Sequence, residues 1–245
     1  MSLAAKAGTL ALCLAAFLPG VARAESVPFV GCRSDGQVGP LPAPPRRATP
    51  QLAPAVARQL AYYASENNGV LAPRGWHCFG LYGSNGSILI VTPEPHDARD
   101  LLRARPQPLR GPAVQLTYSD GGTSGRFAVA NLIARAFPAY LAFARRVEAE
   151  GLGDPLPAGP YRTDRMVRLR QDAVGYQTPA RREGLGTDSR LVPNDRPIDG
   201  LAVIDPEGDM GVIKIDVRLS AAQAALATPI LNSELPRRRA RRSVH

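Results

Sequence analysis

The chain has 245 residues, 44% of them hydrophobic, and a formal net charge of +9. Setting aside Lys6, Arg23 and the five arginines of the run PRRRARR at 236–242 leaves a body near +2. That balance makes nucleic acid an unlikely partner. Beyond the first 24 residues no stretch has the roughly 18 consecutive apolar residues of a transmembrane helix, so none is expected in the mature chain.

Residues 1–24 have the pattern of a secretory signal peptide. Lys6 precedes an apolar run at 8–22, and Ala22-Arg23-Ala24 forms a small-x-small cleavage site. The run is short for a membrane span and contains Pro19-Gly20. We therefore expect Sec-type export from a bacterial cell, a mature chain that begins at Glu25, and a periplasmic or secreted location.

Two cysteines remain once Cys13 leaves with the signal peptide. Cys32 and Cys78 are an even pair in a chain that we expect to reach an oxidising compartment, so they predict a disulfide. The bridge would close a loop of about 47 residues and contribute roughly 4 kcal/mol of stability in the chain-entropy model. We expect Cys78 to be structural rather than a reactive thiol.

The first half of the mature chain predicts a helix followed by a hairpin. The helix should begin at Thr49-Pro50 and stop at Asn67-Asn68-Gly69, because apolar residues from Leu52 to Tyr63 recur at helical spacing. The hairpin should pair 76–83 with 87–93 around Asn85-Gly86, a dipeptide typical of tight turns.

The second half alternates helices with strands. In chain order we expect a short helix at 96–104, a strand at 111–119, a glycine-rich turn at 120–125 and a long helix at 126–150 that Pro138 kinks or divides. A strand at 165–179, a polar loop at 180–197, a hairpin at 198–220 turning at 206–209, and a last helix at 221–235 should follow.

These elements predict an α+β protein with a largely antiparallel sheet built from hairpins, three or four helices and one disulfide. A strand–helix–strand crossover through 113–150 and 165–176 would instead give a mixed sheet, and this alternative stays open. We expect a proline-rich extended lead-in at 25–48, a single globular domain at 49–235, and a disordered arginine-rich tail at 236–245. Two lobes, 49–150 and 161–235 joined by 151–160, are the alternative.

The stretch RGWHCFGLYGSNGS at 74–87 gathers Trp76, His77 and Cys78, and a neighbouring histidine and cysteine raise the question of a thiol active site. Neighbouring residues on a strand point to opposite faces, so His77 is badly placed to act as the base for Cys78. We therefore interpret the stretch as a structural hairpin. His77 is then either a polar residue on the outer face of its strand or the histidine that a catalytic site at the glycine-rich turn would need.

The turn DGGTSGR at 120–126 partly matches the Gly-x-Ser-x-Gly nucleophile elbow, with strand before it and helix after it. A triad of Ser124, His77 and Asp120 is one hypothesis, with His96, Asp97 or Asp100 as alternative partners. The competing interpretation is a tight strand-to-helix connection in which Thr123 or Ser124 caps the helix.

The same turn suggests an anion site. Backbone N–H groups at a helix N-terminus attract phosphate or carboxylate, and an arginine beside them adds charge. The candidate ligands of a small anion are Gly121, Gly122, Thr123, Ser124 and Arg126.

Metal and cofactor sites are not expected. Asp205, Glu207 and Asp209 faintly resemble a calcium loop but lack its twelfth-position glutamate, and they suit a plain hairpin turn. The arginine tail could contact an anionic membrane surface weakly. Together these observations predict a non-catalytic envelope binding or accessory protein with an unidentified partner, or alternatively a serine hydrolase that uses Ser124.

Overall fold

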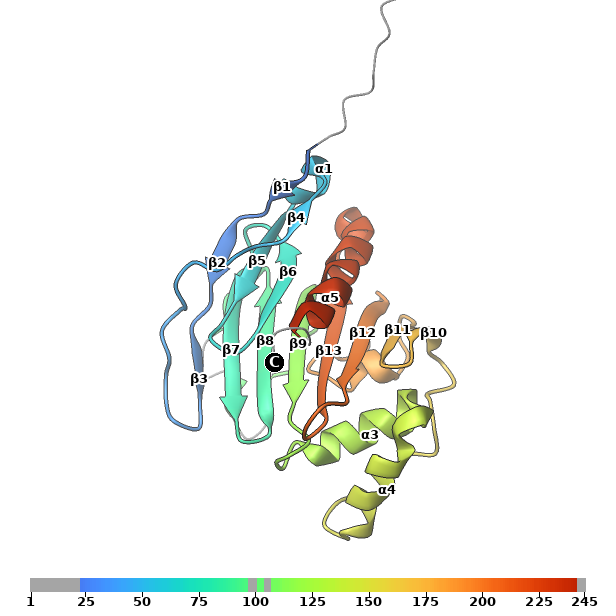
Figure 1. The fold of residues 1–245 in the computed structure, drawn as a ribbon. Helices are drawn as coiled ribbons and strands as arrows, with labels where there is room; N and C mark the ends of the chain where they lie inside the picture. The colour runs from blue at the N-terminus through green and yellow to red at the C-terminus, as the bar shows by residue number, and fades with distance from the viewer. Residues whose placement is uncertain (1–22, 97–100, 104–106, 242–245) are drawn as a thin grey trace, which may run out of the picture.

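The structure is a computed structural model that describes residues 23–96, 101–103 and 107–241, with side chains described as far as Leu235. Its main body is an eight-stranded sheet in the order β10-β11-β12-β13-β9-β8-β7-β3 (Figure 1). The strands are β3 (Ser34–Gly36), β7 (His77–Gly83), β8 (Gly86–Thr92), β9 (Ala113–Ser119), β10 (Arg165–Arg170), β11 (Ala173–Thr178), β12 (Ile198–Asp205) and β13 (Gly211–Arg218).

The predicted α+β class is confirmed, and the main sheet is mixed. Seven neighbouring strand pairs join its eight described strands, and every pair is antiparallel except β3 with β7. The parallel pair therefore comes from the proline-rich lead-in and not from the crossover expected through 113–150. That crossover does run from β9 to β10, but β13, β12 and β11 lie between the two strands.

Both predicted hairpins are confirmed. β7 and β8 pair in register through Gly83 and Gly86, and β12 and β13 pair from Asp199 to Asp205. Gly86 has φ +135°, and a Cβ on it would collide with the carbonyl of Tyr118 on β9. Glycine is required here by both the turn and the close approach of the next strand.

The helix expected from Thr49 to Asn67 is wrong. Helix α1 (Pro54–Ala57) is a single turn, and the chain then forms β5 (Leu60–Ala64) and β6 (Gly69–Pro73). All five residues of each strand are buried. A helix would turn part of such a continuous run toward solvent, whereas a strand covered on both faces buries all of it.

The lead-in is also more structured than expected. β2 (Phe29–Gly31) pairs in parallel with β5 to give a three-stranded sheet β2-β5-β6, and β1 (Glu25–Ser26) pairs with β4 (Gln51–Leu52). The predicted disulfide is present: Cys32 Sγ lies 2.04 Å from Cys78 Sγ. It joins the segment between β2 and β3 to β7. Because β2 belongs to the three-stranded sheet and β7 to the main sheet, the disulfide links the two sheets.

The second half contains one further difference and one further agreement. The strand expected at 165–179 is a hairpin, β10 and β11, that turns at Gln171-Asp172. Pro138 divides the long helix as predicted, into α3 (Arg126–Ala136), the 3-10 turn η1 (Pro138–Tyr140) and α4 (Leu141–Ala149). The short helix expected at 96–104 falls largely outside the described residues.

The last helix follows the 3-10 turn η3 (Ala221–Leu226) as α5 (Ala227–Arg241). It therefore continues through much of the arginine run, where we expected disorder from residue 236, because arginine and alanine are good helix formers. Contact of that run with an anionic membrane stays a prediction. In the described part of the chain, no helix combines the length and the apolar character needed to cross a bilayer.

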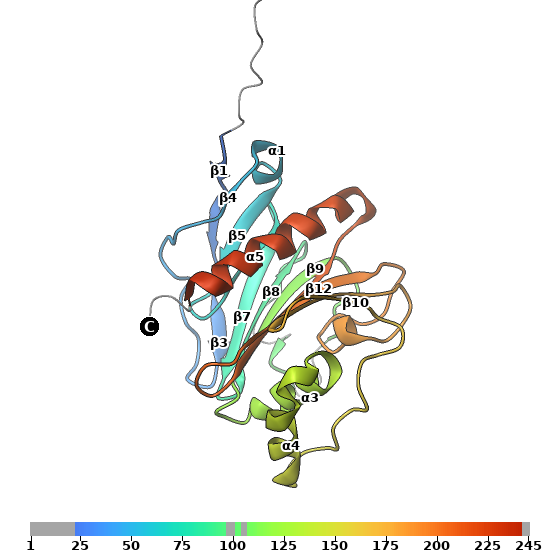
Figure 2. The same ribbon diagram turned by 45° about the vertical axis from the view of Figure 1, so that its right-hand side comes forward.

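Buried apolar clusters lie on both faces of the main sheet. The three-stranded sheet and α5 cover one face, where Tyr63, Leu71, Leu116 and Ile230 are buried together (Figures 1 and 2). Helices α3 and α4 cover the other face near β11 to β13, where Ile133, Phe137, Ala202 and Ile204 are among the buried residues. A third buried cluster includes Leu81 of β7, Ile90 of β8 and Ala113 of β9. Polar side chains of β9 and β13, among them Thr117 and Lys214, build the site described next.

Candidate functional site: a cavity over β9 and β13

The predicted catalytic triad is not assembled. Asp120 N–H bonds to Asn85 O, so the turn that carries Ser124 adjoins the Gly83 end of β7. His77 begins β7, and the six residue steps between the two ends span about 20 Å. His96 follows β8 at that same far end, and Asp97 and Asp100 lie outside the described residues. Ser124 is exposed, and no described histidine lies beside it.

The turn is a structural connection, although its cap differs from the one predicted. Gly125, and not Thr123 or Ser124, is the N-cap of α3. Asp120 accepts hydrogen bonds through Oδ1 from Gly122 N–H (2.9 Å) and through its carbonyl from Thr123 Oγ1 (3.1 Å). Thr123 Oγ1 in turn accepts from Gly125 N–H at 3.3 Å. Asp120 thus holds the turn closed.

The anion site at Gly121, Gly122, Thr123, Ser124 and Arg126 stays a prediction, and several contacts of the turn argue against it. Gly122 N–H donates to Asp120 Oδ1, and Arg126 forms an ion pair with Glu150 at 2.8 Å. A Cβ on Gly122 would touch the carboxylate of Asp209. Two carboxylates beside the turn, from Asp120 and Asp209, would repel an anion.

A different part of the structure forms the strongest candidate site. A cavity of about 590 Å³ lies between the second face of the sheet and α3. This volume falls within the range of roughly 300–1,000 Å³ that is typical of small-molecule sites. Its floor is β9 and β13, one wall is α3, and the remaining walls are the connection 154–161 and the loop 185–188. The polar lining residues are Thr117, Ser119, Asn131, Arg135, Asp154, Tyr161, Asp188 and Lys214.

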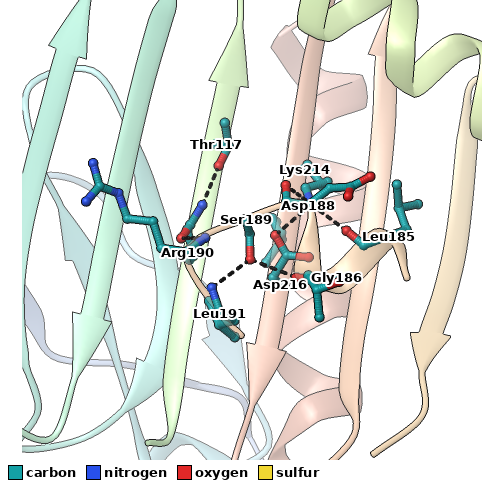
Figure 3. A network of polar contacts seen from close by, with 12 residues as sticks. Thr117, Leu185, Gly186, Asp188, Ser189, Arg190, Leu191, Lys214 and Asp216 are labelled. Carbon is teal, nitrogen blue, oxygen red and sulfur yellow. Dashed lines mark hydrogen bonds and ion pairs between the residues drawn. The ribbon is translucent and has the colours of Figure 1, made fainter. Parts of the chain in front are cut away.

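The floor contains a buried cation that forms two hydrogen bonds and an ion pair. Lys214 on β13 is 7% exposed, and its Nζ donates to Leu185 O at 2.7 Å and to Asp188 O at 2.8 Å (Figure 3). It also forms an ion pair with Asp216 Oδ2 at 3.3 Å. Lys214 therefore fastens the loop to the sheet, and its ammonium group is shielded from the role of a free nucleophile or base.

Beneath Lys214, Asp216 is fully buried. Tyr176 on β11 donates its hydroxyl proton to Asp216 Oδ1 at 2.5 Å. Burial raises the pKa of the Asp216 carboxyl to about 6, although Lys214 and the Tyr176 hydroxyl both act to lower it. Burial, followed by the charge of Asp216, raises the pKa of Tyr176 well above 10, so this phenol stays a hydrogen-bond donor. The pair positions the floor of the cavity and does not face its interior.

The loop over the floor is held at several further points. Leu185 N–H donates to Asp164 Oδ2 at 2.7 Å, and Gly186 N–H donates to Thr178 Oγ1 at 2.9 Å. Ser189 Oγ bridges the loop by donating to Gly186 O (2.7 Å) and accepting from Leu191 N–H (3.1 Å), as Figure 3 shows. The cavity therefore has a rigid loop as one wall, because backbone and side chain both anchor it.

The connection between α4 and β10 closes the outer side. The Arg135 guanidinium of α3 stacks on the Tyr161 ring, 3.7 Å from its centre, and donates through Nη1 to Gly159 O at 3.1 Å. Tyr161 Oη donates to Asp188 Oδ1 at 2.7 Å. Burial and then Asp188 raise the pKa of Tyr161 to about 12. The proline-rich connection is thus a strap that joins α3 to the loop across the cavity.

Several polar groups in the cavity keep free hydrogen-bonding capacity. Within the described residues the side chains of Ser119, Asn131 and Asp154 make no hydrogen bond or ion pair, and the carboxylate of Asp188 meets only the Tyr161 hydroxyl. Leu132, Leu185 and Val212 add apolar surface to the same lining. The arrangement can hold a small organic molecule with polar ends and an apolar middle.

Sequence reasoning missed this site. Lys214, Asp216 and Arg218 alternate with apolar residues on β13, a pattern that ordinarily indicates a strand with one face in solvent. The one available signal was that Lys214 is the sole lysine after Lys6 in a chain otherwise rich in arginine. Asp205, Glu207 and Asp209 were compared with a calcium loop on sequence. Among the described residues, no group of three or more potential metal-ligating side chains is found.

Comparison with known proteins adds no assignment. No protein-family model matches the chain, no curated protein is detectably similar to it in sequence, and no solved structure matches its fold.

Proposed function

We propose that this protein is exported from a bacterial cell and binds a small molecule in the cavity over β9 and β13, as a non-catalytic binding or accessory protein of the cell envelope. The observation that carries the proposal is the cavity itself. It has the volume of a ligand site, rigid walls, and unpaired polar groups from three separate segments, Ser119, Asn131 and Asp154.

Two observations support export. The Cys32–Cys78 bridge requires an oxidising compartment to persist in most organisms. Within the described residues the first strand, β1, begins at Glu25, which is the residue expected to follow signal cleavage after Ala24.

Binding is favoured over catalysis by how the reactive groups are used. Lys214 is bonded to two carbonyls and paired with Asp216, and Tyr161 is bonded to Asp188 with a raised pKa. These groups hold the walls together rather than stand ready to transfer protons. The remaining free groups are a hydroxyl, an amide and carboxylates, which suit recognition by hydrogen bonds.

Blocking the cavity tests the binding proposal. Ala128 is an exposed residue of α3 on the cavity lining, and Ala142 is an exposed residue of α4 outside it. The mature protein, recovered from the envelope of a bacterial host, should carry or acquire a small molecule detectable by native mass spectrometry. Ala128→Trp should remove that molecule and Ala142→Trp should retain it. Equal retention by both variants would refute the cavity as the binding site.

Export is tested separately. Mass analysis of the protein from the periplasm or the medium should give a chain that begins at Glu25 and contains a disulfide. Leu12→Arg places a charge in the apolar segment of the signal peptide and should leave uncleaved protein in the cytoplasm. A wild-type chain that stays full-length in the cytoplasm would contradict the proposed location.

A further inference from the structure

The charges around the cavity differ in how far the protein itself neutralises them, and that difference limits what can bind. Lys214 on the floor is matched by Asp216 and two carbonyls. Arg135 on α3, Asp154 on the strap and Asp188 on the loop also line the cavity and form no ion pair with the described residues; Arg135 is half-buried and both carboxylates are exposed. Arg135 and Asp188 contact the same Tyr161 side chain, so the cavity offers both signs of charge to a ligand.

The cationic side is preorganised. Arg135 is half-buried, lies flat on the Tyr161 ring and donates one Nη1 hydrogen bond to Gly159 O. The rest of its N–H donors make no hydrogen bond to the described residues. Asn131 lies one helical turn before it on the same wall of the cavity. A guanidinium with an amide beside it is well suited to binding a carboxylate, because its planar array of N–H donors can form two parallel hydrogen bonds to the two carboxylate oxygens.

The anionic side is formed by segments of the strap and the loop. Neither Asp154 nor Asp188 has an ion-pair partner in the described part of the chain. Asp188 accepts only from the Tyr161 hydroxyl. That phenol remains protonated, because the negative charge of Asp188 and burial both raise its pKa. These carboxylates have free acceptors for an ammonium group.

Leu132, Leu185 and Val212 add apolar surface to the same lining. A simple anion would meet two carboxylates without ion-pair partners, and a simple cation would meet Arg135. A ligand that carries both charges can bind all three groups, and an apolar side group would cover the apolar surface. The cavity volume of about 590 Å³ accommodates such a ligand up to the size of a short peptide.

Building on the proposed binding function, we infer that the cavity takes a zwitterion of the α-amino-acid class, a free amino acid or a short peptide. Its carboxylate binds Arg135 and Asn131, and its ammonium group binds Asp154 and Asp188. Ser119 Oγ is available for a peptide amide or side chain.

The test uses ligands that differ by one charge at a time. The mature, disulfide-bonded protein is first screened by thermal shift against the protein amino acids and L-alanyl-L-leucine. The best binder is then compared by calorimetry with its N-acetyl and C-terminal amide forms. Because a hydrogen bond to a charged group contributes about 1.5–3 kcal/mol, each cap should weaken binding by roughly 10- to 100-fold.

Variants assign each charge to its residue. Arg135→Gln should weaken the free acid but bind the amide as the wild type does. Asp154→Asn and Asp188→Asn should similarly lose the preference for a free amine over the acetylated form. Arg145→Gln, at an exposed position of α4 outside the cavity, is the control and should change nothing. Asp154 has no bond to lose, so its variant separates binding from folding even if Arg135→Gln loosens the strap.

Capped ligands that bind as tightly as the zwitterion would overturn the inference, as would a ligand that needs only one of the two charges. Failure of every amino acid and of the dipeptide would also overturn it. In each of those cases retention of another molecule by the wild type, and its loss in Ala128→Trp, would leave the proposed binding function standing.

Discussion

Removing the Cys32–Cys78 bridge should lower the free energy of unfolding by about 4 kcal/mol. The two cysteines are 46 positions apart. In the chain-entropy model a loop of that length removes roughly 14 cal/mol/K from the unfolded chain, which is about 4 kcal/mol at 25 °C. A domain of this size has a total stability of roughly 5–15 kcal/mol, so the loss should be a large fraction of it.

The measurement is urea unfolding followed by the fluorescence of Trp76, the single tryptophan, which packs against the core beside Cys78. Reduced wild type isolates the effect of the cross-link, because it keeps both sulfur atoms. The double variant Cys32→Ala/Cys78→Ala should lose more, since Cys32 is 1% exposed and its side chain fills core volume. If the reduced protein stays within 1 kcal/mol of the oxidised one, the loop must already be constrained in the unfolded chain, and the calculation fails.

Two buried charges give further predictions. Burial raises the pKa of Asp216 from 3.8 to about 6, so the folded state binds the extra proton, and unfolding free energy should fall by up to about 3 kcal/mol as pH rises from 4 through 6. Urea titrations at several pH values should show this slope in wild type and not in Asp216→Asn; equal slopes would contradict it. Arg218 is 1% exposed and donates to the carbonyls of Leu109, Gly111 and Val192. Arg218→Met should therefore cost about 3–5 kcal/mol by the same assay, with Arg218→Lys intermediate, and a loss below 1 kcal/mol would argue against this role.

The hairpins and the disulfide could be predicted because their signals are local or countable. Asn85-Gly86 specifies a tight turn whatever surrounds it, Pro138 removes a helical donor, and two cysteines in an oxidising compartment have one way to pair. The prediction of a helix over residues 60–64 failed because a continuous run of buried apolar residues satisfies helical and strand periodicity equally. The deciding fact, that β2 and β6 flank this segment, is set by residues elsewhere in the chain.

The candidate site could not be predicted for a related reason. Alternation of Lys214 and Asp216 with isoleucines correctly predicts a strand but suggests that its charged face is exposed to solvent. That face is instead covered by the loop 185–191, whose carbonyls accept from Lys214. Conversely, the turn that carries Ser124 and the strand that carries His77 were each predicted correctly. Ser124 nevertheless lies beside one end of β7, and His77 lies at the other. Sequence spacing carries no information about which end of a sheet a side chain reaches.

The position of β13 has a consequence for how this chain acquires its structure. β13 occupies an interior place in the main sheet, between β9 and β12, yet it comes from residues 211–218, near the end of the chain. During synthesis, β9 therefore keeps one open hydrogen-bonding edge until residues 211–218 have emerged. Pairings of such long sequence separation fold slowly and leave partly formed sheets prone to association. A chain cut short before residue 211 would expose β9 permanently, so premature termination should yield aggregates rather than a smaller folded domain.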